Sequence, residues 1–279
     1  MQGIGNDFIL VDCIDAKCAP EDIQAHAVAL CDRRFGIGSD GVLAVCPSDA
    51  ARLRMVMYNP DGSEGMCGNG LRCFVKYAYE SGRVREAAFP VETLAGIVHV
   101  QLSLASTDGD LPSVVSAVRA DMGRPRLMRA EIPMLGLPDE QVVDEVLSVG
   151  EDRFTVTCAS MGNPHCVIFV HDVDAVPLEE WGPQIELHPA FPQRTNVEFV
   201  EVVHPAMLKV RVWERGAGVT LACGTGACAT VVAGVLAGKS GRHCTVSLPG
   251  GALDVEWAPD EHVFMAGPAE TVFKGSIAI

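Results

Sequence analysis

The sequence predicts an α+β fold made of two similar halves, each a sheet that encloses a helix. Two Cys-Gly-x-Gly stretches, beginning at Cys67 and Cys223, each follow an alternating, strand-like run and open a helix. They lie 156 positions apart (223 − 67 = 156), and the Gly-Asn pairs that begin at Gly5 and Gly162 lie 157 apart (162 − 5 = 157). A shared offset indicates a duplicated unit. The helix after Cys223 is apolar all round, so it must be buried.

Local start, stop and turn patterns place the elements of the first half. Pro20, with acidic residues in the same turn, begins a helix, and Ser81-Gly82 ends the helix that follows Cys67. Asn59 opens a strong turn and, like Arg215, lies eight positions before a cysteine (67 − 59 = 8; 223 − 215 = 8). We expect strands at 8–11, 42–45, 53–58, 89–93, 97–104 and 114–121, helices at 20–31 and 68–79, and a loop at 104–112.

The second half begins after a Pro-, Gly- and Arg-rich segment, 123–138, that has no clear period. We place the domain boundary near its start, which gives a first domain of 1–121 plus about 268–279 and a second domain of 122–267. The expected strands are at 154–159, 166–170, 197–203, 208–213, 246–248, 253–257, 263–266 and 269–273, and the expected helices are at 178–187 and 224–236.

Composition limits the classes of partner. The 279 residues are 48% hydrophobic, which is ample material for a core in each half. A net charge of −15 argues against nucleic acid or an anionic membrane as the main partner. It leaves an anionic small-molecule substrate open, because a site can be locally positive. No apolar run approaches the roughly 20 residues that cross a bilayer.

The cysteines indicate a reducing compartment. There are eleven, an odd number, with no CxxC pair, no HExxH and no other ligand-like spacing, so we expect no metal site. Met1 is not followed by a signal-peptide pattern, and we expect a cytoplasmic protein. Most of the cysteines are best explained as small apolar core residues: Cys13, Cys18, Cys31, Cys46, Cys158, Cys166 and Cys244, with Cys73 and Cys228 also assigned to packing.

Cys67 and Cys223 differ from these because each stands at a predicted helix N-terminus. The helix dipole there favours a thiolate, and the free backbone N–H groups form an anion site for a carboxylate or phosphate. A Walker-type phosphate loop needs a lysine where Ala227 stands, so a nucleotide cradle is not expected.

Six ordered blocks along nearly the whole chain are specific enough to indicate a family. The sequence resembles the diaminopimelate epimerase family, which implies an isomerase of two pseudo-symmetric domains, each a barrel-like, mostly antiparallel sheet around a central helix. It also implies that no cofactor is used. The matching blocks are Gly3 to Phe8, Asn59 to Cys73, Ser160 to His165, Arg194 to Val197, Glu214 to Thr220 and Ala222 to Ala227.

The resemblance implies that Cys67 and Cys223 are the two bases of the reaction. Inversion of a carbon centre removes a proton from one face and delivers one to the other, so a thiolate and a thiol are needed together. Without a cofactor, the carbanion-like transition state needs strong hydrogen bonding at the α-carboxylate. The implied donors are the backbone N–H groups of Gly68, Asn69, Gly224 and Thr225.

Further roles carry over position by position. Arg215 matches the partner of the distal carboxylate, for which a planar guanidinium suits a bidentate contact. His165 and Glu214 match residues that tune the cysteine pKa values, and Glu214 also matches a substrate contact. The matching substrate-binding asparagines are Asn6, Asn59, Asn163 and Asn196.

Plainer explanations of these residues stay open. The asparagines at 6, 59 and 163 also suit turns beside Gly or Pro, and His165 suits a hydrogen-bonded core histidine. Glu214 and Arg215 also suit an exposed ion pair.

Three features depart from the family pattern. Gly41 stands where the family usually carries a substrate-contacting Gln, which puts one contact in doubt. The segment from Asn59 to Cys67 is one residue shorter than expected, so its loop is expected to be reshaped. The chain starts almost on its first motif, which predicts a weaker N-terminal sheet.

We therefore expect an enzyme that interconverts LL- and meso-2,6-diaminopimelate in lysine and peptidoglycan precursor synthesis. We expect it to act on this small-molecule substrate and to be able to form a homodimer. Related two-cysteine enzymes are the nearest alternative: proline or hydroxyproline racemases and phenazine-type isomerases. A thiol redox or metal-binding protein would need a closer spacing than Cys67/Cys73 or Cys223/Cys228 provides. A non-catalytic binding module is a third alternative, and the presence of both cysteines argues against it.

Overall fold

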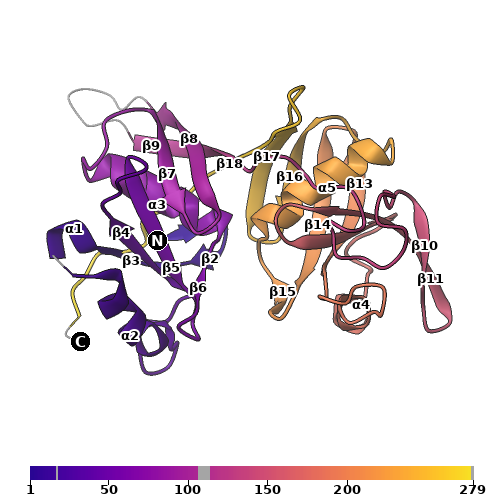
Figure 1. Ribbon diagram of the computed structural model, residues 1–279, viewed down its shortest axis with the longest axis horizontal. Coiled ribbons are helices and arrows are strands. Elements are labelled where there is room, and N and C mark those ends of the chain that lie inside the picture. Colours follow the sequence, from indigo (N-terminus) through magenta and orange to yellow (C-terminus); the bar gives the residue numbers. More distant parts are fainter. Residues whose placement is uncertain (17, 106–113, 278–279) are drawn as a thin grey trace. The chain divides into compact units, whose positions relative to one another are not determined.

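The computed structural model describes residues 1–16, 18–105 and 114–277. The chain forms two compact units, one of Met1–Asp121 with Ala266–Ile279 and one of Met122–Met265. Each unit is a mixed sheet with one central helix and smaller helices beside it (Figure 1). The fold is therefore α+β with two domains, as the sequence predicts.

In the sheet of the first unit, most strands lie side by side in the order in which they occur along the chain. Helix α2 and strands β5 and β9 have the bounds that the sequence predicts. Its elements are β1 (Gln2–Gly3), β2 (Asn6–Asp7), β3 (Ile9–Asp12), α1 (Cys13–Ala16), α2 (Pro20–Cys31), β4 (Val42–Cys46), β5 (Leu53–Tyr58), β6 (Glu64–Gly65), α3 (Gly68–Glu80), β7 (Ala88–Thr93), β8 (Gly96–Ala105) and β9 (Val114–Asp121). The loop expected at 104–112 falls on β8 for its first two residues and otherwise lies outside the described residues.

The second unit repeats this plan with an additional hairpin at its start. Its elements are β10 (Glu145–Val149), β11 (Asp152–Ser160), β12 (Pro164–Val170), α4 (Leu178–Glu186), β13 (Asn196–His204), β14 (Met207–Glu214), β15 (Gly218–Thr220), α5 (Gly224–Leu236), β16 (His243–Leu248), β17 (Gly251–Trp257) and β18 (Val263–Gly267). Strand β10 was not predicted, because its alternation is short and follows a segment without a period.

Strand pairing shows that the two units share one topology. In the first, β3–β4 and β5–β7 are parallel, and β4–β5, β5–β6 and β7–β8 are antiparallel. In the second, β12–β13 and β14–β16 are parallel, and β13–β14, β14–β15 and β16–β17 are antiparallel. The duplicated unit inferred from the sequence offsets is thus present in the pairing pattern.

The register corrects one detail of the sequence match. Tyr58 pairs with Val42 and Trp213 pairs with Val197, so the residue after each is equivalent. Asn59 therefore corresponds to Glu214, and not to Arg215 as the spacing from the cysteines suggests. The reason is one extra residue between β15 and α5, compared with the segment between β6 and α3.

The central helices differ in character. Nearly every residue of α5 is buried and apolar, as the sequence predicts. Helix α3 also buries two cationic side chains, Arg72 and Lys76. Lys76 donates to the backbone oxygen of Val115 at 2.8 Å and forms an ion pair with Glu80 at 2.7 Å. These contacts satisfy a charge that would otherwise be costly to bury.

Strand alternation gives the sheet of the second unit two distinct faces. Cys166, Val197 and Phe199 point into an apolar cluster shared with α4, where Phe154 packs edge-on against Trp181. Their neighbours along the strands therefore point to the opposite face, the side on which α5 lies. This alternation places the polar residues of β12 and β13 near the start of α5.

The strand expected at 269–273 is wrong. Glu270 forms only an isolated bridge with Gln2, in which each backbone N–H donates to the other residue's oxygen at 2.9 and 2.8 Å. Beyond it Val272 and Phe273 are exposed. The segment has strand-like side chains, but a strand also needs an open sheet edge along its length. In the described part of the chain, none of the helices is long and apolar enough to span a membrane.

Candidate active site

Cys67 is the residue that precedes the first turn of α3. Its backbone is extended (φ −140°, ψ 125°), and its carbonyl accepts the first helical hydrogen bond, from Leu71. Its half-buried thiol donates to the side-chain oxygen of Asn6 at 3.3 Å. Asn69 donates to the same oxygen at 3.2 Å. The structure therefore brings three of the predicted site residues together at the start of α3.

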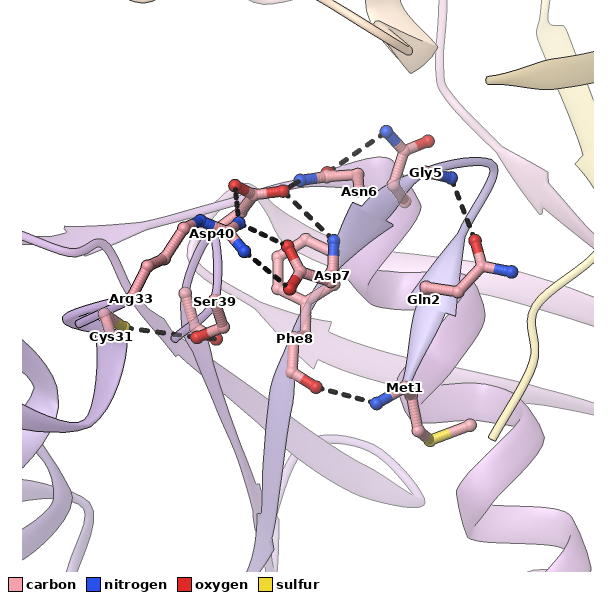
Figure 2. Close-up of polar contacts among 12 residues, drawn as sticks. Met1, Gln2, Gly5, Asn6, Asp7, Phe8, Cys31, Arg33, Ser39 and Asp40 are labelled. Carbon is pink, nitrogen blue, oxygen red and sulfur yellow. Dashed lines mark hydrogen bonds and ion pairs between the residues drawn. The ribbon is translucent and has the colours of Figure 1, made fainter. Parts of the chain in front are cut away.

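The Asn6 amide is held from its other end by a charged cluster (Figure 2). Its nitrogen donates to Asp40 at 2.5 Å, and the same carboxylate oxygen accepts from the backbone N–H of Asp7. Arg33 pairs with both carboxylates, at 2.6 Å to Asp7 and 2.8 Å to Asp40. Because a carboxylate accepts only, Asp40 fixes the amide nitrogen toward itself and the oxygen toward Cys67. This role of Asp40 is not predicted from the sequence.

Gly41, which follows this cluster, has no room for a side chain. A Cβ there would lie 2.9 Å from the backbone oxygen of Tyr58 and 3.2 Å from the Met57 side chain. The glutamine that the family usually carries would therefore require the backbone of β4 or β5 to shift. This steric clash supports the expectation from the sequence that the glutamine contact with substrate is missing here.

Asn59 lies in a tight turn after β5. Its backbone N–H donates to Ser63 at 2.8 Å, its side chain donates to the Ser63 hydroxyl at 3.0 Å, and its carbonyl accepts from Gly62. These contacts give Asn59 a turn role, which was the plainer explanation of this residue.

Cys223 occupies the equivalent position before α5 but is more deeply buried, with 5% of its surface exposed. Its backbone is again extended (φ −126°, ψ 109°), and its sulfur accepts the backbone N–H of Gly226 at 3.3 Å. The Thr225 hydroxyl lies 3.6 Å from the sulfur. The sulfur thus caps its own helix, where the dipole favours negative charge.

Two nearby carboxylates oppose the effect of the helix dipole on the Cys223 sulfur. Burial raises the pKa of its thiol well above the usual range, and the charges of Glu214 and Glu198 raise it further. Hydrogen bonds from Thr225 and Gly226 act in the lowering direction but are outweighed. The thiol is therefore the favoured form of Cys223.

Glu214 is itself displaced from ordinary carboxylate behaviour. Burial raises its pKa, a hydrogen bond from Thr220 lowers it, and the neighbouring Glu198 raises it. A carboxyl group that holds its proton more readily beside a cysteine is common at catalytic sites. The exposed ion pair with Arg215 that the sequence left open is not what the structure shows for Glu214.

His165 is fully buried between two partners, one predicted from the sequence and one not. Its Nδ1 lies 2.7 Å from Glu198, and its Nε2 lies 3.0 Å from the side-chain oxygen of Asn163. The Asn163 nitrogen donates to the Thr225 hydroxyl at 3.2 Å. Glu198 was missed by the sequence analysis, although its period-two spacing from Asn196 places both on the face of β13 toward α5.

Arg215 lies on an exposed turn whose backbone is held in place. Asn196 accepts the Arg215 backbone N–H at 2.9 Å and donates to the Pro164 carbonyl at 2.8 Å. The buried Glu186 accepts the backbone N–H of Gly216 at 3.0 Å. In this state Asn196 supports the turn that carries Arg215, and the guanidinium donates only to the carbonyl of Gln193 among the contacts of the described residues.

The two Gly-Asn pairs are equivalent in conformation as well as in sequence. Gly5 has φ 88° and Gly162 has φ 97°, a region that residues with a Cβ rarely adopt. Each turn places its asparagine near the start of the central helix of its own unit. Within the described residues, no group of three His, Cys, Asp or Glu side chains could hold a metal ion.

Comparisons with solved structures show what the fold is similar to. The fold matches that of a phenazine biosynthesis protein of the PhzF family from Bacillus anthracis (TM-score 0.64, 19% identity, 96% of this chain and 92% of that chain). It also matches a hydroxyproline epimerase from Agrobacterium vitis (TM-score 0.62, 16% identity, 89% of this chain and 78% of that chain). These likenesses show the fold, and the relatives described next show the class, an isomerase of the epimerase kind.

Sequence comparison identifies the family within that class. The family model for diaminopimelate epimerase matches residues 1–128 and 157–272. A diaminopimelate epimerase from Pelotomaculum thermopropionicum is 55% identical over 98% of this chain and 95% of its own length. The chain belongs to the diaminopimelate epimerase family, which confirms the resemblance seen in the sequence.

Proposed function

We propose that this chain interconverts LL- and meso-2,6-diaminopimelate, with Cys67 and Cys223 as the two bases. Membership of the family supports the substrate. The observation that carries the mechanism is the repeated geometry: in each unit one cysteine with extended backbone immediately precedes the central helix. Each sulfur serves one face of the α-carbon, as a thiolate that takes the proton or a thiol that delivers it.

The backbone supplies the stabilisation that a cofactor would otherwise provide. The first N–H groups of a helix have no partner within the helix, so those of Gly68, Asn69, Gly224 and Thr225 are suited to bind the α-carboxylate. Charge that develops on this carboxylate during proton removal strengthens the same hydrogen bonds. No metal and no organic cofactor is needed for this scheme.

The remaining polar residues are proposed to bind and orient substrate. Arg215 binds the distal carboxylate, and Glu214 binds the distal ammonium group. Asn196 fixes the turn of Arg215 and reaches the substrate from it. Asn6, which contacts the Cys67 sulfur, and Asn163, which contacts Thr225 beside Cys223, also orient the α-amino group. Asn59 contributes a further substrate contact from its turn.

We also propose that the enzyme works in the cytoplasm as a homodimer without nucleic acid or membrane partners. All eleven cysteines are free thiols, which suits a reducing compartment. The charge of −15 disfavours polyanionic partners. Light scattering of the reduced protein tests the dimer, for which a monomer mass would be the contrary result.

Proton exchange at the α-carbon tests the reaction directly. LL-diaminopimelate is incubated in deuterated water with reduced protein and no added cofactor, and NMR follows the α-proton. Deuterium at that carbon with formation of the meso isomer is expected, and none with proline. Exchange with proline instead would replace the substrate, and exchange with neither would overturn the proposed function.

A further inference from the structure

The carboxylate of Glu198 is the most deeply buried charge near Cys223. Its residue is 0% exposed, and one of its oxygens has no hydrogen-bond partner among the described residues. The other oxygen lies 2.7 Å from His165 Nδ1. A Cβ at position 226 would lie 2.7 Å from this oxygen, so the glycine there is what admits the carboxylate beside the first turn of α5. Burying an anion this way is costly unless it has a cationic partner.

An unbroken series of contacts leads from this carboxylate to the sulfur. It runs from Glu198 to His165 (2.7 Å), to Asn163 (3.0 Å), to Thr225 (3.2 Å) and to Cys223 (3.6 Å). We call these five residues the Glu198 chain. They come from β13, β12 and its preceding turn, and the start of α5.

The Glu198 chain can run in two directions, because each ring nitrogen of His165 can donate or accept a hydrogen bond. In the first direction Nδ1 donates to the Glu198 carboxylate, which accepts only, and Nε2 donates to the Asn163 oxygen. His165 is an imidazolium paired with Glu198 in that state. The Asn163 nitrogen donates to Thr225, which leaves the Thr225 hydrogen free to point at the sulfur. This direction suits a thiolate at Cys223.

Rotation of the Asn163 amide by half a turn reverses the chain. The amide nitrogen then donates to Nε2, the amide oxygen accepts from Thr225, and Thr225 accepts from the Cys223 thiol. His165 is neutral in that state. Between the two states the sulfur loses one proton and Nε2 holds one more, so the net charge of the group is unchanged.

We propose that Glu198 is a positioning residue for the reaction: by pairing with the imidazolium of His165, it makes available the chain direction in which Thr225 donates to the Cys223 thiolate. Within the second unit, the charges that act on Cys223 are those of Glu214 and Glu198, His165 contacts Glu198, and α5 itself carries no charged side chain. The charges of Glu198 and Glu214 both disfavour the thiolate directly. Only Glu198 also acts through His165, and in this proposal that contribution supports the thiolate and outweighs the direct one.

The test compares the two carboxylates by matched substitutions. Glu198→Gln keeps the shape and removes the charge, so we expect the pKa of Cys223 to rise by about one unit. Glu214→Gln is expected to lower it. The thiolate is followed by its ultraviolet absorbance as a function of pH, with Cys223→Ser as the blank. A purely packing role of Glu198 predicts no shift, and a direct charge effect predicts a downward shift; either result would overturn the proposal.

A second pair of variants interrupts the chain without touching Glu198. Thr225→Val removes the hydroxyl and is expected to give the same upward shift, whereas Thr225→Ser keeps it and is expected to change the pKa little. If circular dichroism shows that Glu198→Gln does not fold, the two Thr225 variants still decide whether the chain changes the pKa of Cys223. An unchanged pKa in Thr225→Val would overturn the role of the chain.

Turnover gives an independent measure. Glu198→Gln is expected to lower kcat about tenfold with KM nearly unchanged, because it alters the base and not substrate binding. This inference rests on the proposed function of Cys223, but the titration reads the thiol without substrate. A titration that fails while epimerisation persists would refute only the role of Glu198, and a shifted pKa in an enzyme without epimerase activity would refute only the function.

Discussion

The two cysteines share one backbone geometry and have different chemical surroundings. Cys67 donates to the neutral amide of Asn6, which is itself fixed by Asp40. Cys223 lies beside two carboxylates and accepts a helical N–H. The duplicated scaffold therefore fixes where each sulfur stands, while the side chains on neighbouring strands determine its charge. The proposed two-base reaction, with one thiolate and one thiol, requires such a difference.

Removal of either sulfur is the strongest way to break the comparison. Cys67→Ser and Cys223→Ser are each expected to lower kcat by at least about 100-fold, because both faces of the α-carbon need a base. Cys73→Ala and Cys228→Ala, on the same two helices, are the controls and should stay active. Epimerisation rates and circular dichroism check this, and full activity in either serine variant would exclude a two-base role.

The residues that follow Tyr58 and Trp213 offer a second contrast, since Asn59 is equivalent to Glu214 and only the second unit continues with an arginine. Arg215→Ala is expected to raise KM for diaminopimelate by about 10- to 100-fold, the range for losing a charge-assisted hydrogen bond. Arg211→Ala, on strand β14 just before the turn of Arg215, is the control. Steady-state kinetics would contradict the assignment if the two variants had the same KM.

Variants of the two aspartates near the Asn6 amide test the surroundings of Cys67 in the first unit. Asp40→Asn lets this amide rotate, because the new side chain can also donate, and kcat is expected to fall about tenfold. Asp7→Asn disturbs the same Arg33 ion pair but leaves the contact between Asp40 and the Asn6 side chain. Equal losses in the two variants would indicate a general effect of the charged cluster.

The smallest expected effect is on stability at alkaline pH. Burial raises the pKa of Cys73 from 9.0 to about 12, so the fold favours its protonated form. The resulting stability is complete below about pH 9 and is lost as pH rises toward 12, by at most about 1.4 kcal/mol per pH unit for one thiol. Urea unfolding at about pH 8 and pH 10 should show a smaller loss in Cys73→Ala than in the unchanged protein. An identical loss would assign the effect to other groups.

Much of the fold was predictable because its patterns are local. The helix at 20–31 and the strands at 53–58 and 114–121 were predicted to the residue, since start residues and alternation define them. The short pairs β1, β2, β6 and β15 were not predicted, because two or three residues carry no period and form strands only through a distant partner. The strand wrongly expected at 269–273 fails for the same reason: propensity is local, whereas an open sheet edge is not.

The site was predictable to a similar degree. Cys67 and Cys223 follow from their spacing and from the helices they open. Asp40 contacts Asn6 from the turn before β4, and Glu198 contacts His165 from the neighbouring strand, so only the folded structure shows which residues meet there. Glu198 also interrupts an apolar run, and in hindsight a charge at a period-two position beside Asn196 is an indication of a polar face.

The chain order of the two units has a consequence for folding. The first unit is interrupted at Asp121 and completed only by the segment from Ala266, where Glu270 bonds to Gln2 and Pro268 accepts from the buried Arg72. The second unit is continuous, so a chain that ends at residue 265 contains all of it and lacks only the last contacts of the first unit. We expect a released chain truncated after residue 265 to protect the second unit from protease and to leave the first open, so that the half that begins the chain depends on the end of the chain.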